Sequence, residues 1–513
     1  MDYRNFLYGT LATSSVVLPV AWSYYSSSQK YHPGPPKLPI VGNLLQIPRE
    51  VPWKTYQEWA KIYGPCVHLE VLGHQILVLN ESKDAEELLS KRGLNNSERP
   101  HLVMAGDLVG FGRGLALLPY DDAAREARKL IHLTVGAKPF TSYYGLIESE
   151  TMRYLCGLRD SPENVNRHLS YAAGAIILKI AYGYDVIPKD DPLVALANEA
   201  LEKFSRTTLL GEFPVDLLPI LQYVPSWFPG VQFKALAEEW RVLGKDLFDR
   251  PFNYVKEQIK RGTAAPSFAE THLQNLEEWN DHEIGSKAEI IKATATSLYA
   301  GAADTTVSAM RSFFLAMTIY QDVQRKAREE IDRVIGSGRL PTLADKADLP
   351  YCSSLVKEVL RWGVVGPLGI PHVAKVDDVY QGYNIAKGTI IVANIWAMLH
   401  DEKAYPNPFD FNPDRFAEGT QPDPVQYVFG FGRRACPGSH MAQSSMFLSM
   451  TQTLALFNIQ RARDERGEEI IPAPEFVTGT ISHPAPFQSK IIPREDRLHL
   501  FQDRTTMGTH SGE

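Results

Sequence analysis

One ten-residue stretch near the C-terminal end constrains this 513-residue chain more than any other. It reads Phe-Gly-Phe-Gly-Arg-Arg-Ala-Cys-Pro-Gly, from Phe429 to Gly438. Glycines on both sides of Cys436 allow the backbone to turn tightly around the sulfur atom. The apolar run that follows, from Met441 to Phe447, is compatible with a helix. The N-terminal end of that helix would direct its N–H groups and positive dipole at Cys436 and so favour the thiolate.

A thiolate in such a loop, with no second cysteine close to it in the sequence, is suited to bind a haem iron as an axial ligand. It would donate electron density to the metal and favour O–O cleavage. The alternative is a buried structural cysteine in a glycine-rich turn. The stretch fits the pattern F-x-x-G-x-R-x-C-x-G at every fixed position, namely Phe429, Gly432, Arg434, Cys436 and Gly438. In this pattern the chain resembles the cytochrome P450 family.

The resemblance implies a mainly α-helical fold with small β-sheets, in a single large catalytic domain. It also implies heme b as the cofactor, with Cys436 as the axial ligand of the iron. The loop residues Phe429, Arg434 and Gly438 would then lie against the cofactor. The similarity runs from about Pro33 to Pro493.

Composition and charge exclude other classes of protein. The formal net charge of −7 at pH 7 leaves no basic footprint for nucleic-acid binding. The four cysteines form neither a zinc-binding pattern nor a disulfide framework, which indicates a reducing, cytosol-facing compartment. Cys66, Cys156 and Cys352 are therefore expected to be small core residues.

The N-terminal region has the features of a membrane anchor. Residues 6–25 carry no charge and are long enough to cross a bilayer as a helix, although Ser, Thr and Pro19 dilute the run. A cleaved signal peptide is the alternative. Lys30 and Lys37, just beyond the span, favour an anchor with the protein body on the cytoplasmic side. The proline-rich segment 32–39 then resembles the linker of microsomal members of the family.

These features divide the chain into three parts. We expect a membrane anchor with a short flank in residues 1–29, the haem-thiolate catalytic domain in residues 30–493 and a polar, disordered tail in residues 494–513. The resemblance to microsomal members implies the endoplasmic reticulum membrane, with the catalytic domain facing the cytosol.

A long apolar stretch, residues 293–321, predicts a helix buried through the protein. Between Lys292 and Asp322 its only charged residues are Asp304 and Arg311. A second transmembrane span is the alternative, but five threonines and three serines make it a poor one.

Small residues and an acid–alcohol pair interrupt this helix at Gly301–Thr306. Small side chains let a flat ligand approach the helix, and hydroxyl groups can bond to its carbonyls. The segment resembles the oxygen-activation motif of the family, with Ala302 at a position often held by glycine. By this resemblance Asp304 and Thr305 are catalytic and relay protons to dioxygen.

Glu358 and Arg361 lie at i, i+3 in a predicted helix, where they face one another. As an isolated pair they would form an ordinary surface ion pair. Together with Arg415, in the segment Asn412–Phe416, they resemble the E-x-x-R motif of the family and its partner arginine. The resemblance implies a buried Glu358–Arg361–Arg415 cluster that supports the cysteine loop.

A helix with an acidic start is predicted over Asp121–Val135. The family usually has W-x-x-x-R here, and both residues hold a haem propionate. This chain has Ala124 in place of the tryptophan and keeps Arg128, which the resemblance implies as a propionate ligand. Arg99, His372 and Arg434 resemble further propionate contacts.

One face of the same helix is basic. Arg125, Lys129 and His132 follow one another at i, i+4 and i+7. Because the reductase of the family presents acidic patches, this face is a candidate docking surface. The alternative is an ordinary solvated face.

Other segments are assigned by pattern. Hairpins are predicted at residues 67–79 and 380–392. The glycine-rich run 110–114 is not expected to bind phosphate, because no strand precedes it; in the family this region roofs the substrate pocket. The aromatic loop Val224–Gly230 is either a packed surface loop or a segment that dips into the membrane or gates the channel. Segments predicted to line the pocket are residues 100–118, 299–306, 364–370 and 478–482.

Together these features predict a haem-thiolate monooxygenase that inserts one atom of dioxygen into a small apolar or aromatic molecule. Residues 366–372 and Asp377–Tyr380 resemble fungal members that act on secondary metabolites. Electrons would come from NADPH through a cytochrome P450 reductase, because the chain has no dinucleotide-binding fingerprint. The alternative is a haem-thiolate isomerase or dehydratase that uses no dioxygen, against which Asp304 and Thr305 argue. A non-catalytic haem sensor or electron carrier would need neither an anchor nor a roofed pocket.

Overall fold

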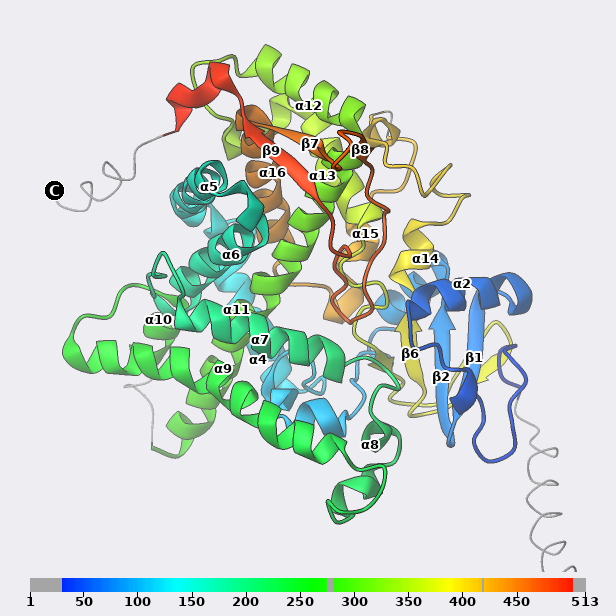
Figure 1. Cartoon of the computed structure of the whole chain (residues 1–513). Helices are drawn as coiled ribbons and strands as arrows, with labels where there is room; N and C mark the ends of the chain where they lie inside the picture. The colour runs from blue at the N-terminus through cyan, green and yellow to red at the C-terminus, as the bar shows by residue number, and fades with distance from the viewer. Residues whose placement is uncertain (1–29, 275–280, 418, 502–513) are drawn as a thin grey trace, which may run out of the picture.

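The long apolar stretch forms α11 (Asp281–Ile319), around which the other helices are arranged (Figure 1). The structure is a computed structural model that describes residues 30–274, 281–417 and 419–501. The helix begins earlier than predicted and ends slightly sooner, because α12 (Gln321–Val334) starts a new helix after Tyr320. Across the described residues, no helix has both the length and the apolar composition needed to cross a membrane. The predicted anchor, residues 1–29, lies outside the described part.

The mainly α-helical architecture predicted from the sequence is confirmed (Figure 1). The other long helices are α4 (Asp122–Val135), α5 (Tyr144–Asp160), α6 (Val165–Tyr182), α7 (Pro192–Thr207), α9 (Phe233–Arg261), α13 (Pro350–Trp362) and α16 (Ser439–Leu456). Shorter ones are α2 (Pro52–Tyr63), α3 (Ser82–Ala85), α8 (Pro214–Leu217), α10 (Phe268–Gln274), α14 (Ile395–Leu399) and α15 (Val425–Val428). The predicted helix over 121–135 is α4, and Asp121 caps it by accepting a hydrogen bond from the Ala124 N–H.

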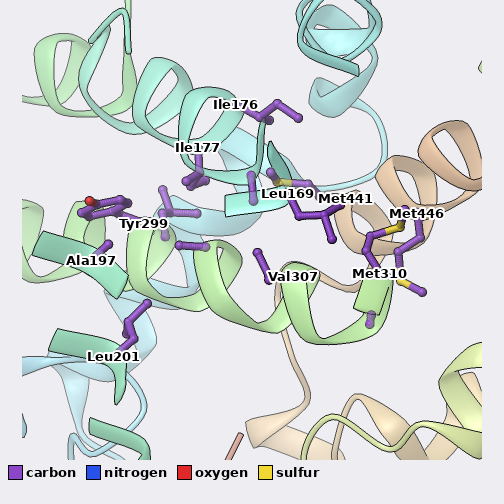
Figure 2. Packing of buried hydrophobic residues seen from close by; sticks show 14 of the residues in the cluster. Leu169, Ile176, Ile177, Ala197, Leu201, Tyr299, Val307, Met310, Met441 and Met446 are labelled. Atoms are coloured by element: carbon purple, nitrogen blue, oxygen red, sulfur yellow. The ribbon is translucent and has the colours of Figure 1, made fainter. Parts of the chain in front are cut away.

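The main hydrophobic core surrounds α11. Side chains of α6, α7 and α16 pack against it from different directions (Figure 2). The buried residues labelled there include Ile176, Ile177, Ala197, Leu201, Tyr299, Val307, Met310, Met441 and Met446. Cys66, Cys156 and Cys352 are buried and form no disulfide within the described residues, as expected of small core residues. Apolar burial of this kind is the main stabilising contribution to such a fold, and it fixes the position of α11.

Three small sheets lie beside the helices in the described part of the chain. The largest has the strand order β1-β2-β6-β3, made of β1 (Cys66–Val71), β2 (His74–Leu79), β6 (Ile390–Ala393) and β3 (His372–Val373). The others pair β4 (Asp378–Tyr380) with β5 (Tyr383–Ile385), and β8 (Glu469–Ile470) and β9 (Ser489–Pro493) with β7 (Phe457–Arg463). The hairpin predicted at 67–79 is confirmed: β1 and β2 are antiparallel and turn at Leu72 and Gly73, both with positive φ as such turns require.

The hairpin predicted at residues 380–392 is only partly right. It closes sooner, between β4 and β5, and β6 leaves it to pair in parallel with β2 in the larger sheet. All four residues of β6 are buried, as expected of an inner strand with side chains covered on both faces.

The chain stays ordered beyond the predicted boundary at residue 493. Residues Glu495–Leu500 form the 3-10 helix η12, although the sequence analysis placed them in a disordered tail. Arg494 and Arg497 hold this segment to α12 through Asp332, at 2.8 and 2.6 Å. Residues 502–513 lie outside the described part.

Candidate functional site

The cysteine loop connects α15 to the N-terminus of α16. Its backbone is closed by hydrogen bonds from the Cys436 N–H to the Phe429 carbonyl, at 2.7 Å, and from the Ala435 N–H to the Gly432 carbonyl, at 3.2 Å. Gly432 has a φ of +51°, and a Cβ there would lie 2.3 Å from the Leu89 carbonyl oxygen. This position therefore requires glycine. Gly438 has an ordinary φ of −92° and is the N-cap of α16, so its conformation does not demand glycine.

The Cys436 side chain has accessible surface, yet protein surrounds the thiol closely enough for burial to raise its pKa. Both observations hold if the side chain opens into an internal hollow. The Gly438 N–H and Arg128 lower the pKa of the thiol, as the sequence predicted for the helix end. Desolvation outweighs them, so these groups alone do not make a thiolate. A bound metal cation would reverse the balance, because it deprotonates a coordinating thiol outright.

Glu358, Arg361 and Arg415 form one buried cluster. Glu358 accepts hydrogen bonds from Arg361 Nε at 2.7 Å, from Arg415 Nε at 3.1 Å and from the Asn412 N–H at 2.7 Å. The Glu358 and Arg361 side chains are 0% exposed, which excludes the surface ion pair considered above. The arginines also donate to backbone carbonyls of the segment that precedes the cysteine loop, at Leu399, Pro406, Pro408 and Asp410.

On α11, Gly301 lies in a stretch of buried and half-buried residues. It is exposed, and a Cβ placed there would meet nothing within 4 Å. The Thr305 hydroxyl donates to the Gly301 carbonyl at 2.7 Å, which satisfies part of the local backbone. The Asp304 carboxylate lies 3.2 Å from His483 Nε2 and is 20% exposed. The helix thus has open space beside an alcohol and an acid.

Four basic side chains converge near the cysteine loop from separate elements. Arg128 on α4 donates to the Ala435 carbonyl at 2.7 Å. Arg434 donates to the carbonyls of Ser97 and Leu118 at 2.8 and 2.7 Å. Arg99 donates in the same way to Ala116, Ile370 and Pro371, and His372 Nδ1 lies 2.7 Å from the Asn96 carbonyl oxygen.

Comparison with known proteins identifies this arrangement. The sequence pattern of the family described as Cytochrome P450 matches residues 32–490. The chain belongs to the cytochrome P450 family. It is 42% identical to the cytochrome P450 monooxygenase claR of Ampulloclitocybe clavipes over 504 residues, which cover 96% of this chain and 93% of the relative. It is 40% identical to the cytochrome P450 monooxygenase ppsD of Aspergillus oryzae over 474 residues, 90% of this chain and 88% of the relative.

Membership and these relatives make the protein a haem-dependent monooxygenase, and the family implies a haem whose iron is bound by a thiolate. The four basic side chains of this P450 fit such a group. Burial is the main factor that lowers the pKa of Arg99, Arg128 and His372, and that of Arg434 to about 10. Within the described residues, none of the three arginines forms an ion pair with a carboxylate. The positive charges of these arginines would therefore be balanced by an anionic group, and heme b carries two carboxylates.

The segment 100–118, which is predicted to roof the pocket, is attached to α11. The Leu115 N–H donates to Ser297 Oγ at 2.9 Å. A cavity of about 180 Å³ lies here. It is lined by the apolar residues Leu115, Leu118, Ala123, Ala127, Ile290 and Ala293, together with Ser297 and the charged residues Arg113 and Glu289. It matches the predicted segment 100–118 but meets α11 before residues 299–306. Another hollow, of about 290 Å³, lies between α12 and η12. Arg494, which lines it, already forms ion pairs with Asp332 and Asp496.

The glycine-rich run 110–114 contains a 3-10 turn, η4 (Phe111–Arg113), and follows a π-helical segment, η3 (Val103–Leu108), rather than a strand. A phosphate-binding loop, which needs a preceding strand and a following helix, is therefore excluded here.

The basic face on α4 is exposed as predicted. Arg125 contacts Asp122, and Lys129 lies 3.5 Å from Glu126, so its charge is partly compensated within the helix. His132 is exposed one turn further along.

His483 is a residue of the site that the sequence analysis missed. The predicted pocket segment 478–482 ends one position before it. A single histidine before a proline carries no local signal, and only the fold brings it to Asp304.

Proposed function

We propose that this P450 inserts one atom of dioxygen into a small apolar or aromatic molecule, as part of fungal secondary metabolism. The observation that carries the proposal is the acid–alcohol pair on α11 beside the open space at Gly301. The mostly apolar lining of the cavity between segment 113–127 and α11 suits an apolar substrate. The fungal monooxygenases among its relatives support the setting.

We assign the thiolate ligand to Cys436. The Gly438 N–H is directed at its sulfur, and the Cys436 N–H donates to the Phe429 carbonyl and closes the loop. Arg99, Arg128, His372 and Arg434 would hold the two propionates of heme b. Arg361 and Arg415, both paired with Glu358, would support the loop through the carbonyls that they bind in the preceding segment, residues 399–410. When bound, a thiolate-ligated haem supplies dioxygen binding and its reductive cleavage.

Two residues of α11, Asp304 and Thr305, would deliver protons. The Thr305 hydroxyl is tied to the Gly301 carbonyl and so stays at the open position of the helix. Asp304 is partly exposed and can exchange protons with solvent, which a general acid must do in every cycle.

The second candidate is a haem-thiolate isomerase or dehydratase that uses no dioxygen. It would share the cysteine loop and the arginines, but it needs no acid–alcohol pair. The relatives named as monooxygenases do not favour it.

Electrons would come from NADPH through a cytochrome P450 reductase. The exposed basic face on α4, with Arg125, Lys129 and His132, is our candidate for its docking surface. Opposite charges on two faces steer association, which suits a transient electron donor.

We also propose that residues 1–29 anchor the catalytic domain, residues 30–493, to the cytosolic side of the endoplasmic reticulum membrane. Exposed apolar side chains of two segments, residues 40–45 and 220–227, support this. Ile40, Leu45, Ile220, Tyr223 and Trp227 are between 69% and 81% exposed. The two segments adjoin, because Leu44, Ile47 and Leu217 pack in one cluster. Such a patch beside an anchor suits contact with lipid. Deletion of residues 1–29 should shift the protein from microsomes toward the soluble fraction with haem content retained; complete solubility of the full-length chain would contradict the anchor.

The reaction is tested by incubating the full-length enzyme and a reductase in membranes with a fungal metabolite extract and isotopically labelled dioxygen. We expect a product heavier by one oxygen atom that carries the label and depends on NADPH. A product that forms equally without dioxygen would overturn the monooxygenase proposal and favour the isomerase or dehydratase.

A further inference from the structure

The residue opposite Asp304 belongs to a loop that the proposed function has not used. Residues 476–485 form this loop, and its base is closed by hydrogen bonds from the Val477 N–H to the His483 carbonyl and from the Ala485 N–H to the Glu475 carbonyl, both at 2.8 Å. A loop closed in this way can hold a side chain at a defined place.

The loop is attached to α11 next to His483. Ser308 on α11 donates its hydroxyl to the Ser482 carbonyl, and both serines are buried. The Ser482 N–H donates to the Val365 carbonyl at 2.8 Å. The backbone next to His483 is therefore fixed by two hydrogen bonds, one to α11 and one to Val365, and neither involves the histidine side chain.

The far end of the loop is attached to α7. Ser205 Oγ accepts from the Ile481 N–H at 3.0 Å, and the Thr208 hydroxyl donates to Thr480 Oγ1 at 2.9 Å. A Cβ on Gly479 would lie 2.7 Å from Ser205 Oγ, so this approach requires glycine. The position of His483 thus depends on α7 as well as on α11.

The His483 ring lies between a carboxylate and a guanidinium. Nε2 is 3.2 Å from Asp304 Oδ2, and Nδ1 is 3.5 Å from Arg311 Nη1. Arg311 is fixed in turn by donating to the Pro484 carbonyl at 2.9 Å. Because a guanidinium only donates, Nδ1 must accept, and the ring proton is then on Nε2, directed at Asp304.

We propose that His483 is a positioning residue for Asp304: it donates its Nε2 proton to the carboxylate in a tautomer selected by Arg311. The proposal rests on the proton-delivering role of Asp304 in the proposed function. One carboxylate oxygen is then held by His483, while the other stays available to exchange protons. Without the histidine the carboxylate is free to rotate, or to turn toward Arg311 on the same helix.

The decisive variants are His483→Leu, which removes both ring nitrogens, and His483→Gln, whose amide can still donate to Asp304. With NADPH and reductase, we expect His483→Leu to lower product formed per NADPH on the order of tenfold, the worth of one hydrogen bond to a charged group. The lost reducing equivalents should appear as hydrogen peroxide. His483→Gln should restore most of the yield. His499→Gln, an exposed histidine on η12, is the matched control and should change nothing.

Turnover driven by added hydrogen peroxide separates this role from a purely structural one. Peroxide and substrate yield the oxygenated product and one water, so no dioxygen, electron or proton has to be supplied. We expect His483→Leu to retain this reaction. Loss of the peroxide-driven reaction as well, with no rescue by His483→Gln, would mean that His483 only supports the fold and would overturn the proposal.

The tautomer is a readout independent of turnover. In ¹⁵N-histidine spectra of the holoenzyme, with the His483 signals assigned by their absence from His483→Gln, we expect a proton on Nε2 and an unprotonated Nδ1. The opposite tautomer would overturn the proposal. If His483→Leu is normal while Asp304→Asn is slow, the positioning role fails and the proposed function stands; if both are normal, the role of Asp304 itself fails.

Discussion

The two sides of the proposed haem centre are held by different means. On the thiolate side, which comprises residues 429–438 with Glu358, Arg361 and Arg415, the contacts go largely to backbone carbonyls, and the supporting Glu358–Arg361–Arg415 cluster is closed to water. On the helix side, which comprises Asp304, Thr305 and the loop 476–485, side chains of distant segments meet. Asp304 and His483 there are 20% and 17% exposed.

This difference matches two tasks. A metal ligand must not move, and burial of a fully satisfied cluster restricts movement. A proton donor must be recharged from solvent after each cycle, which a sealed site would prevent. The closed side therefore suits binding of the cofactor, and the partly open side suits delivery of protons. The predictions below test this division.

The largest effect is expected at the ligand itself. Cys436→Ser should abolish the red-shifted Soret band of the reduced, CO-bound protein and all product formation, because a hydroxyl does not replace a thiolate. Absorption spectra of the purified variant measure this. Cys66→Ala, at a buried cysteine of β1, is the control and should keep the band. A Cys436→Ser protein with an unchanged band would exclude Cys436 as the ligand.

The next effect concerns the cluster beneath the loop. Glu358→Gln leaves two buried arginines without a carboxylate, which should destabilise the protein by about 3–5 kcal/mol and reduce haem content. Thermal unfolding and haem content measure this. Glu58→Gln breaks an exposed pair with Lys61 at the same i, i+3 spacing and should cost about 0–1 kcal/mol. Equal losses in the two variants would contradict the special role of the buried cluster.

On the helix side we expect effects on rate with the fold intact. Asp304→Asn should slow turnover roughly 10²–10⁴-fold while substrate binding and haem content persist, because a positioned proton donor is lost. Thr305→Ala should keep consuming NADPH but release peroxide. Thr318→Ala removes the same kind of hydroxyl-to-carbonyl bond elsewhere on α11 and serves as the control. Fast, fully coupled turnover in the first two variants would refute their role.

The smallest effect is expected at the surface. Reversing charge with Arg125→Glu plus Lys129→Glu should slow the first electron transfer about tenfold at low salt, because steering depends on charge. The difference should fade near 1 M salt, where the Debye length is about 3 Å. Lys256→Glu plus Lys260→Glu, an exposed pair at the same spacing on α9, is the control. Stopped-flow reduction measures both; identical rates at low salt would indicate a merely solvated face.

The sequence predicted the parts whose chemistry is local. The cysteine loop, the E-x-x-R helix and the long apolar helix each carry their signal within a few turns of chain, and the helical fold was predicted from the family that these motifs resemble. The burial of Glu358 could be proposed only through the family resemblance, since an i, i+3 pair looks the same on a surface.

What the sequence could not give depends on contacts between distant segments. His483 meets Asp304 across 179 positions of the chain, and no periodicity encodes that distance. The path of β6 into the larger sheet depends on β2, more than 300 positions earlier by the register of Ile390 with Ile76. The effect of the α16 terminus on Cys436 was predicted in direction, but the opposing desolvation of the thiol appears only once the surroundings are known.

The basic side chains around the centre have a consequence for how such an enzyme diversifies. Arg99 and Arg434 bind the main-chain oxygens of Ala116, Leu118 and Ile370. A main-chain oxygen is the same whatever side chain its residue carries. Over evolutionary time the side chains at these positions can therefore be substituted, which changes the molecules that the enzyme accepts. The hydrogen bonds from the two arginines to the backbone remain. A library randomised at Leu118 and Ile370 should accordingly yield variants that differ in product profile and agree in haem content.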